Sequence, residues 1–284
     1  MSYRTALSEV LTSVIEPAAG STGIEGRFPR GAVTALGRTG LLGLTVSSAL
    51  GGGGLGLPEA AEVVARTARV CPATAVALQY HYTAVAVIES YGSPWLRGEI
   101  AAGRHLSSLA LAEAETETQA DADVDADVED RADVRGAEAQ LLAPRATAAR
   151  SGDVVALRGR KYQVVAAGEA DSYLWSSRPL AAPDGLSLWV VPAHAPDLFV
   201  PARPGGAGPR GSATSTVCAD PVLVPADAML GADGGGLDIV LRTVLPWLLE
   251  LRAAAGAEVL RAPAPAPGVS LGAARRPVGS LASS

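Results

Sequence analysis

The chain has 284 residues, 48% hydrophobic side chains and a formal net charge of −6, which suggests two soluble domains with a sizeable core. A net acidic chain is a poor candidate for nucleic-acid binding, because that binding depends on neutralised phosphates. Cys71 and Cys218 are the only cysteines, so we expect neither a disulfide scaffold nor a cysteine-based metal site. No apolar stretch approaches the ~20 residues of a membrane span, and the start shows no secretory signal. We therefore predict a cytoplasmic protein with no membrane span.

The acidic charge is concentrated in one segment. Residues 113–138 carry a charge of −9 and leave the rest of the chain at +3. Alternating aspartates begin at Asp121, but an EF-hand loop also needs a glycine at its sixth position and a glutamate at its twelfth. Those positions hold Ala126 and Ala132. The segment is predicted to be a solvated acidic loop rather than a calcium site.

The first hundred residues predict helices, because apolar residues recur with helical spacing and prolines stand at the starts. The expected helices are Thr5–Ile15, Pro29–Leu36, Pro58–Val70, one capped by Thr74 and ended by Gly92, and Pro94–Ala102. The fourth helix is apolar around most of its circumference, which is typical of a helix inside a bundle. It carries His81, and a hydrogen-bonded structural role is favoured there over metal binding, because the three histidines are widely scattered.

Short β-rich runs separated by turn signals follow Arg104, which indicates an antiparallel barrel or sandwich. The expected strands are Ser107–Ala112, Asp153–Leu157, Tyr162–Val165, Tyr173–Ser177, Leu186–Val191, Ser215–Cys218 and Val222–Val224. A helix begins again at Gly236, and Pro246 is expected to kink or split it. Residues 263–284 are rich in Ala, Pro, Gly and Ser and predict a disordered tail.

The glycine-rich run Gly51–Gly54 superficially resembles a dinucleotide-binding turn, which places a pyrophosphate at a helix N-terminus. No alternation of strands and helices surrounds it, and no acidic residue stands at a ribose-binding spacing. A loop that joins two helices is therefore the favoured interpretation.

The order of the motifs resembles the acyl-CoA dehydrogenase family. The stretch from Phe28 to Glu59, with its GLLGL and GGGGLG runs, resembles the N-terminal helical domain of that family. Ser108–Glu113 resembles the first strand of its middle β domain, and residues 159–171 resemble its GxKxWITNAxxAD turn. Residues 208–231 resemble its GxRGSxT…FxDVxVPxxNxLG run. The collinear matches extend over about residues 5 to 260.

The resemblance implies an α+β protein with four parts. These are an N-terminal all-helical domain (1–103), a middle antiparallel β-barrel-like domain (104–231) with the acidic insertion 113–138, a truncated C-terminal helical segment (232–262) and the tail. In the family FAD lies between the β domain and a C-terminal four-helix bundle. A carboxylate removes the α-proton of an acyl thioester while the β-hydride passes to the flavin. The residues that occupy the flavin-contacting positions here are Leu109, Leu111, Ala112, Gln163 and Val165.

The sequence departs from the family pattern in four places. One helix stands where the family has a bundle. Ala112 and Ala114 replace the Thr and Pro of a TEPxxGS run, and Gln163 and Val165 replace the Trp and Thr of WIT. The acidic segment also falls where flavin and thioester would meet, and carboxylates there oppose a phosphate-bearing cofactor.

The closing helix supplies the candidate catalytic base. Some family members carry the base on this helix, at a position that aligns with Trp247, and Glu250 lies one turn later on a similar face. The alternative interpretation of Glu250 is a surface glutamate near Arg252.

Two hypotheses follow. The first is an FAD-dependent oxidoreductase that acts on the CH–CH bond of an acyl-CoA or carrier-protein acyl thioester, either impaired or completed by a partner chain. An expected exposed stripe of Val240, Val244, Leu248 and Leu251 motivates a homo- or hetero-oligomer. The second is a flavin-free scaffold or subunit derived from the same fold, which the lost flavin contacts motivate.

Overall fold

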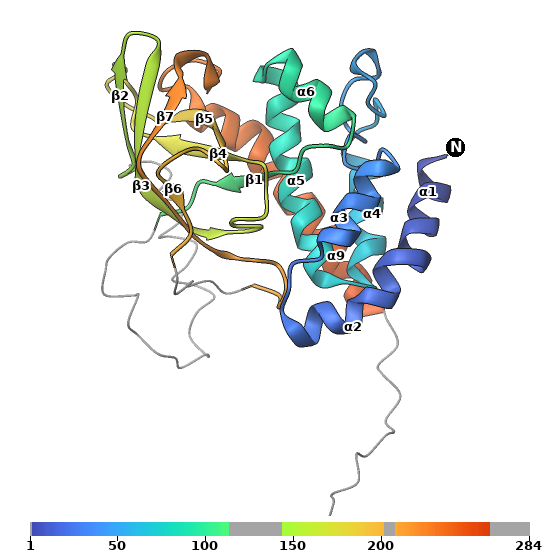
Figure 1. Cartoon of the computed structure of the whole chain (residues 1–284). Helices are drawn as coiled ribbons and strands as arrows, with labels where there is room; N and C mark the ends of the chain where they lie inside the picture. The colour runs from blue at the N-terminus through green and yellow to red at the C-terminus, as the bar shows by residue number, and fades with distance from the viewer. Residues whose placement is uncertain (1, 114–143, 202–207, 262–284) are drawn as a thin grey trace, which may run out of the picture.

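A computed structural model describes residues 2–113, 144–201 and 208–261. Helices form one side of the molecule and two β-sheets form the other, with the last helix running along the helical side (Figure 1). The predicted tail 263–284 and all of the predicted acidic insertion except Glu113 lie outside the described residues.

The N-terminal helices occur close to their predicted positions. Their bounds are α1 (Tyr3–Val10), a π-helical turn (Leu11–Ile15), α2 (Glu16–Glu25), α3 (Arg30–Arg38), α4 (Leu57–Ala68), α5 (Pro72–Tyr91) and α6 (Pro94–Ala101). The first helical stretch continues past its predicted end at Ile15 as far as Glu25. The fourth predicted helix begins at Pro72 rather than after Thr74, because proline suits the first turn of a helix.

The closing helix is neither split nor ended by its proline, contrary to one of the predicted outcomes. It consists of α8 (Gly236–Ile239), a π-helical turn (Val240–Val244) and α9 (Leu245–Arg261), and the residues at both junctions have helical dihedrals. Pro246 follows the wide turn by two residues, just as Pro17 follows the turn at Leu11–Ile15. Proline has no backbone N–H to donate, and its ring clashes with the carbonyl group of the preceding turn in a regular α-helix. The wider hydrogen-bond pattern of a π-turn relieves both problems, so the helix continues through the proline.

Two four-stranded sheets make up the β part of the described residues. One has the order β1 (Ser107–Ala110), β4 (Ser172–Ser177), β5 (Ser187–Pro192), β8 (Met229–Leu230), and the other β2 (Thr147–Ser151), β3 (Val154–Val164), β7 (Ser215–Pro225), β6 (Leu198–Phe199). The strand pairs are antiparallel as predicted, except that β1 pairs with β4 in parallel. The structure replaces each predicted pair of short strands by one long strand, β3 through Gly159 and β7 through Pro221. The register shifts between Leu157 and Gly159, where β7 has one extra residue, and this bulge accommodates Pro221 opposite the glycine.

Helix α5 occupies the centre and joins the two parts. It packs against α4 and α9 on one side and against β1 on the other. His81 on α5 is fully buried: its Nε2 donates to the Leu42 carbonyl oxygen at 2.9 Å, and its Nδ1 accepts from the Ser107 backbone N–H at 3.1 Å. Burial lowers the pKa of His81 to about 4 and keeps the ring neutral. The predicted structural role of this histidine is confirmed, and it fixes the start of β1.

The glycine-rich run is a loop that joins two helices, as predicted. The backbone N–H groups of Gly53 and Gly54 donate to the carbonyl oxygens of Gly43 and Val46 at 3.0 and 2.8 Å. A Cβ added at Gly52 would collide with the Val46 carbonyl. The glycines therefore permit close backbone packing, and these N–H groups are already used.

Candidate functional site

The C-terminal end of β1 lies against β3 and brings three of the predicted flavin-contacting residues together. The Tyr162 backbone N–H donates to the Ala112 carbonyl oxygen at 2.8 Å, so Leu111 and Ala112 lie beside Gln163. Ala112 is exposed, and Leu111 and Gln163 are half-buried. We call these three residues the β1–β3 edge. They form an accessible surface on the β part of the molecule.

The side chains of the other two predicted contacts lie in the core. Leu109 is 5% exposed and packs with apolar residues of α5 and β5, while Val165 is 3% exposed and belongs to the larger of the two clusters of buried apolar residues. The Val165 carbonyl oxygen accepts from the Ser108 hydroxyl at 2.7 Å. Because these two side chains are buried, a ligand at the β1–β3 edge would not contact them and would contact only residues that lie beside them.

Gln163 stands at an irregular point of its strand. The register between β3 and β7 shifts between Lys161 and Val164, and Gln163 has a φ of 53°, which is uncommon for a residue with a Cβ. A bulge of this kind re-aims a side chain and is frequent next to functional sites. It interrupts the alternation of the strand, so Gln163 reaches the accessible edge while Lys161 faces inward.

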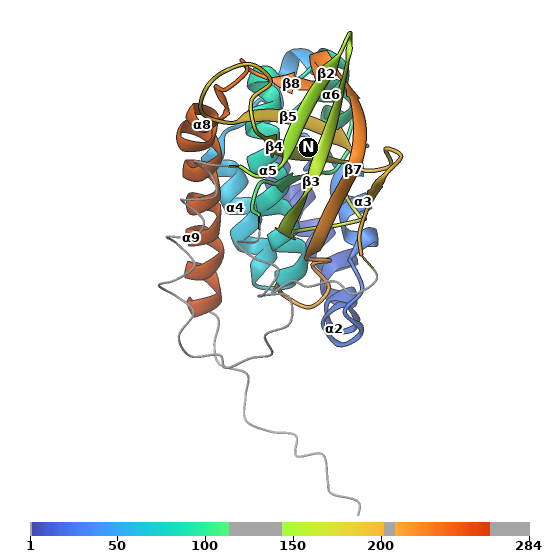
Figure 2. The same cartoon turned by 90° about the vertical axis from the view of Figure 1, so that its left-hand side faces the viewer.

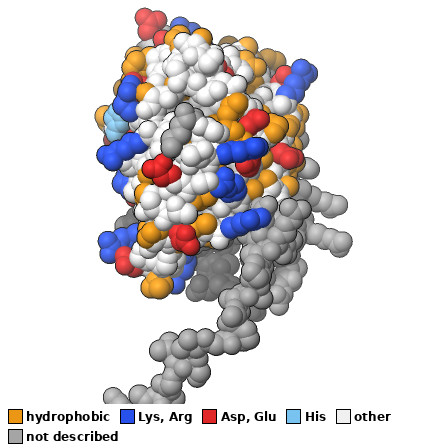
Figure 3. Space-filling model, turned by 90° about the vertical axis from the view of Figure 1, so that its right-hand side faces the viewer, with side chains coloured by type: hydrophobic (Ala, Val, Ile, Leu, Met, Phe, Trp, Pro, Cys, Tyr) orange, Lys and Arg blue, Asp and Glu red, His pale blue; other side chains and the backbone are white. Residues whose placement is uncertain are grey.

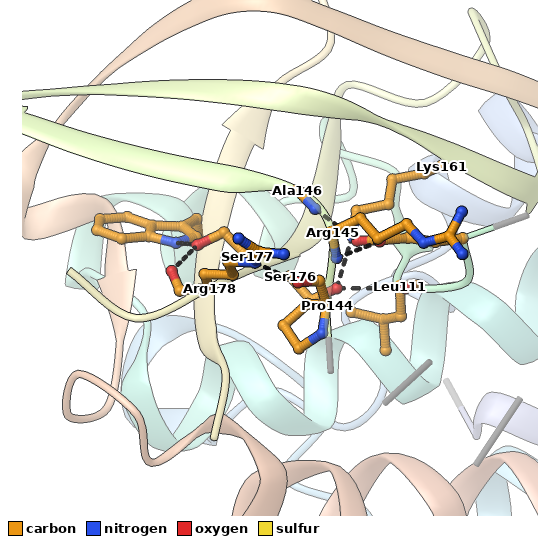
Figure 4. A network of polar contacts seen from close by, with 10 residues as sticks. Leu111, Pro144, Arg145, Ala146, Lys161, Ser176, Ser177 and Arg178 are labelled. Carbon is orange, nitrogen blue, oxygen red and sulfur yellow. Dashed lines mark hydrogen bonds and ion pairs between the residues drawn. The ribbon is translucent and has the colours of Figure 1, made fainter. Parts of the chain in front are cut away.

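A buried ion pair supports this edge from inside (Figure 4). Lys161 is 0% exposed, and its Nζ lies 2.5 Å from Glu113 Oε1 and 2.8 Å from the Ser176 hydroxyl. Ser176 in turn donates to the Leu111 carbonyl oxygen at 3.2 Å. The ammonium also lies 5.2 Å from the centre of the Trp175 ring. This network connects the interior of the β part directly to the candidate site.

Glu113 also joins the two chain segments that flank residues 114–143. Its Oε2 accepts from the Arg145 backbone N–H at 2.6 Å, and its Oε1 accepts from the Ala146 N–H at 3.2 Å. Burial lowers the pKa of Lys161 to about 8, and Glu113 opposes that shift. Lys161 is therefore a structural cation committed to Glu113, and it is turned away from any ligand at the edge.

The sequence contained a weak signal for this network. Lys161 is the only lysine of the chain, and it lies on a β-strand within the GxKxWIT-like motif. Glu113 ends the other motif that defines the predicted site. Nothing in the sequence alone pairs two residues that are 48 positions apart.

Glu250 lies on the outer side of α9. Its side chain is exposed, and the neighbouring Leu251 is fully buried where α9 packs against α4 and α5. Arg252, its predicted neighbour, donates to the Tyr80 hydroxyl at 2.9 Å. The role of Glu250 as a base therefore stays a prediction, and another chain segment would have to cover this face to exclude water from it.

The prediction that Val240, Val244, Leu248 and Leu251 form an exposed apolar stripe on the closing helix is wrong. Val240, Val244 and Leu251 are at most 4% exposed, and Leu248 is half-buried. These side chains are covered because the helix packs against α4 and α5. The apolar surface that remains open lies on the neighbouring row of the helix.

Two surface grooves lie on the helical part, away from the β1–β3 edge. One of about 410 Å³ is lined by residues of α1, α4 and the π-turn, and one of about 270 Å³ is lined by residues of α2 and α3. Acidic and basic side chains are interspersed over the helical face seen in Figure 3. One pair, Arg4 and Glu62, joins α1 to α4 at 2.7 Å.

Within residues 2–113, 144–201 and 208–261, no group of three His, Cys, Asp or Glu side chains could hold a metal ion. In the same described part of the chain, no helix is both long enough and apolar enough to cross a membrane.

Known proteins share this arrangement. Residues 2–102 match the sequence model of the acyl-CoA dehydrogenase N-terminal domain. Cyclohex-1-ene-1-carbonyl-CoA dehydrogenase of Geobacter metallireducens is 28% identical over 244 residues, which cover 83% of this chain and 58% of that protein. Human mitochondrial short-chain specific acyl-CoA dehydrogenase is 26% identical over 236 residues, which cover 80% and 52%. Butyryl-CoA dehydrogenase from Megasphaera elsdenii superposes with a TM-score of 0.75 at 18% identity, over 90% of this chain and 64% of that one.

These similarities define the fold as that of the acyl-CoA dehydrogenases: a helical N-terminal part, a middle sheet part and a closing helical segment. The N-terminal part of the chain matches the model of that family's N-terminal domain, and over most of its length the chain is similar in sequence to members of the acyl-CoA dehydrogenase family. It spans little more than half the length of the curated relatives that it matches.

Proposed function

We propose that the protein is an FAD-dependent oxidoreductase that acts on the CH–CH bond of an acyl thioester of coenzyme A or of a carrier protein. The observation that carries this proposal is the accessible β1–β3 edge in a chain similar to this family, formed by Leu111, Ala112 and Gln163. The names of the two curated relatives, both dehydrogenases of acyl-CoA compounds, support the substrate class.

The residues of this edge fit the ring system of a flavin. A flavin ring is flat and largely apolar with polar atoms along its rim, and ligand sites of this kind combine apolar surface with a few placed polar groups. Leu111 and Ala112 offer the apolar surface. Gln163, re-aimed by the bulge, offers an amide that can donate or accept.

The chain's own residues would then have two roles. Gln163 would orient the ring on the edge, and Glu250 would hold the α-proton of the thioester at its carboxylate. FAD, when bound, supplies the acceptor for the β-hydride. Because Glu250 is exposed on α9, we also propose that the enzyme works as a homo- or hetero-oligomer in which another chain covers this helix.

Binding of FAD tests the proposal directly. The full chain is expected to bind FAD with one-to-one stoichiometry, seen as a bound flavin band near roughly 450 nm. Gln163→Ala is expected to weaken FAD binding about tenfold, because losing one hydrogen bond costs about 1 to 1.5 kcal/mol. The matched control is Arg158→Ala on the same strand, since Arg158 is exposed and pairs with Asp220.

A flavin-free scaffold or subunit is the second candidate function. It is favoured by the burial of Leu109 and Val165 in the core and by the methyl group of Ala112 at a position where the family has a hydroxyl. Absence of FAD binding by the folded chain, also after coexpression with a full-length relative, would support this candidate and contradict the enzyme.

A further inference from the structure

The two residues that give the β1–β3 edge its apolar surface lie beyond the end of a strand. β1 ends at Ala110, which pairs with Trp175 of β4, and Leu111 and Ala112 follow it outside the ladder. The backbone groups of residues outside a ladder need other partners. The positions of Leu111 and Ala112 therefore depend on the groups that bind their backbone.

Lys161 holds the Leu111 carbonyl oxygen from the interior through one hydroxyl group. Lys161 Nζ lies 2.8 Å from the Ser176 hydroxyl, and this hydroxyl lies 3.2 Å from the Leu111 carbonyl oxygen. An ammonium group can only donate, so the Ser176 oxygen accepts from it and the single Ser176 proton is directed to the carbonyl. The cation therefore fixes the direction of the bond that holds Leu111.

Glu113 holds the far end of the same stretch. Its Oε1 lies 2.5 Å from Lys161 Nζ and accepts from the Ala146 N–H at 3.2 Å. Its Oε2 accepts from the Arg145 N–H at 2.6 Å. The backbone N–H of Arg178, which follows β4, donates to the Ala146 carbonyl oxygen at 2.8 Å. One carboxylate thus joins the end of the β1–β3 edge to a segment that is itself attached to the sheet.

These bonds lie between the two sheets. Figures 1 and 2 show the sheet that contains β3 on the outer side of the molecule, with β4 and β5 between it and α5. Lys161 projects inward from β3, where it is paired with Val217 of β7, toward Ser176 and Trp175 of β4. Among the described residues, the Glu113 carboxylate is the charged group that faces the ammonium, and the side chains from β4 and β7 are neutral.

We propose that Glu113, anchored by Lys161, is a positioning residue that holds Leu111 and Ala112 where the flavin ring packs. This inference rests on the proposed function, because the ligand of the edge is the flavin proposed there. A carboxylate is required since it accepts bonds from one ammonium and two backbone N–H groups at once. A glutamine has one acceptor oxygen, and its NH₂ group would face a donor.

Hydrogen exchange of the Tyr162 amide tests the positioning without flavin. This N–H donates to the Ala112 carbonyl oxygen at 2.8 Å, so it exchanges slowly only while Ala112 keeps its place. In the full chain without FAD, Glu113→Gln is expected to raise the exchange rate at Tyr162 at least about tenfold, as measured by NMR. Arg158→Gln changes an exposed side chain of the same strand and should leave the rate unchanged. An unchanged rate in Glu113→Gln would overturn the proposal, whether or not the chain binds FAD.

The affinity for FAD separates positioning from stability. Titration of the full chain, followed by flavin fluorescence, is expected to give a Kd about tenfold weaker for Glu113→Gln and for Lys161→Met. The double variant should recover stability in part, because neither charge is left alone. Its Kd should stay weak, because the bonds that hold the edge are not re-formed. Recovery of affinity in parallel with stability would overturn the positioning role.

The pH profile of FAD binding provides an independent readout. Burial lowers the pKa of Lys161 to about 8, so the ion pair that anchors Glu113 is lost as pH rises above this value. Between about pH 7 and pH 9 the Kd of the wild type is expected to rise relative to that of Lys161→Met, which lacks this titration. A wild-type profile parallel to that of the variant would contradict the role of the pair. Absence of FAD binding at every pH, with the exchange result intact, would instead contradict the proposed function.

Discussion

Lys161→Met is expected to lower the free energy of unfolding by about 3 to 5 kcal/mol, because it leaves the carboxylate of Glu113 buried without its ion-pair partner. Lys161 is fully buried and Glu113 is 5% exposed, so water cannot replace the lost ammonium. Urea denaturation followed by circular dichroism measures the change. For a chain of this size the change corresponds to a fall in Tm of about 6 to 20 °C, at about 2 to 4 °C per kcal/mol.

Two further variants make this result specific to the ion pair. Arg158→Met, on the same strand, removes an exposed partner of Asp220 and is expected to change stability by less than about 1 kcal/mol. Glu113→Gln combined with Lys161→Met is expected to cost less than the sum of the single changes, because neither charge is then left alone. Equal losses for Arg158→Met and Lys161→Met would contradict the structural role of the buried pair.

The same pair predicts a pH dependence at the alkaline side. Burial lowers the pKa of Lys161 from 10.5 to about 8. Between these values the unfolded chain holds a proton that the folded protein has released, so the stability of the wild type relative to Lys161→Met should rise with pH. A difference that falls from pH 8 to pH 10 would be inconsistent with this shift.

His81→Phe is expected to cost about 3 kcal/mol at pH 7, because the Leu42 carbonyl and the Ser107 N–H each lose a buried partner. The pKa of His81 is lowered from 6.5 to about 4. As pH falls through this window, the His81 ring takes up a proton in the unfolded chain but not in the folded protein, so the free energy of unfolding of the wild type decreases. The Phe variant lacks this titration, so its free energy of unfolding has no corresponding decrease. The cost of the substitution therefore shrinks between pH 6.5 and pH 4.

The exposed His194 provides the control for this prediction. His194→Phe is expected to change the free energy of unfolding by less than about 0.5 kcal/mol at either pH. Thermal or urea unfolding at pH 7 and pH 5 distinguishes the two histidines. A cost for His81→Phe that grows on acidification would show that the ring is charged in the folded protein.

Sequence periodicity located the helices because each buries one apolar face, and α5 stood out because it is buried nearly all round. The strands were harder to place. β2 (Thr147–Ser151) is exposed along most of its length, so it has no apolar alternation to detect. β6 and β8 have two residues each. The parallel pairing of β1 with β4 joins residues 65 positions apart, and nothing in the local sequence specifies the direction of that pairing.

The proximity of three of the predicted site residues was predictable from motifs, but the orientation of the side chains was not, and their role as a flavin site stays a prediction. Motif resemblance assigned Leu111, Ala112 and Gln163 to two strands of the β domain, and the structure brings these residues together just after the end of β1. The inward orientation of Leu109 and Val165 depends on packing that the motif does not encode. The Lys161–Glu113 pair depends on the register of the sheet.

The closing helix shows the same limit. Its apolar residues fill two adjacent rows, one that begins at Val240 and one that begins at Leu241. Periodicity alone cannot tell which row is covered, because a helix with two apolar rows fits its neighbours in either orientation. The contacts of α9 with α4 and α5 cover the row that begins at Val240, and the row that begins at Leu241 stays exposed.

The central claim is that this chain uses flavin to oxidise an acyl thioester, and anaerobic reduction of bound FAD tests it most directly. Addition of a short-chain acyl-CoA to the FAD-loaded protein is expected to bleach the flavin band, whereas free coenzyme A should not. Glu250→Gln is expected to bind FAD normally and to lose the bleaching, because an amide cannot accept the α-proton. Bound flavin that no acyl-CoA reduces would contradict the proposed activity, and bleaching that persists in Glu250→Gln would exclude Glu250 as the base.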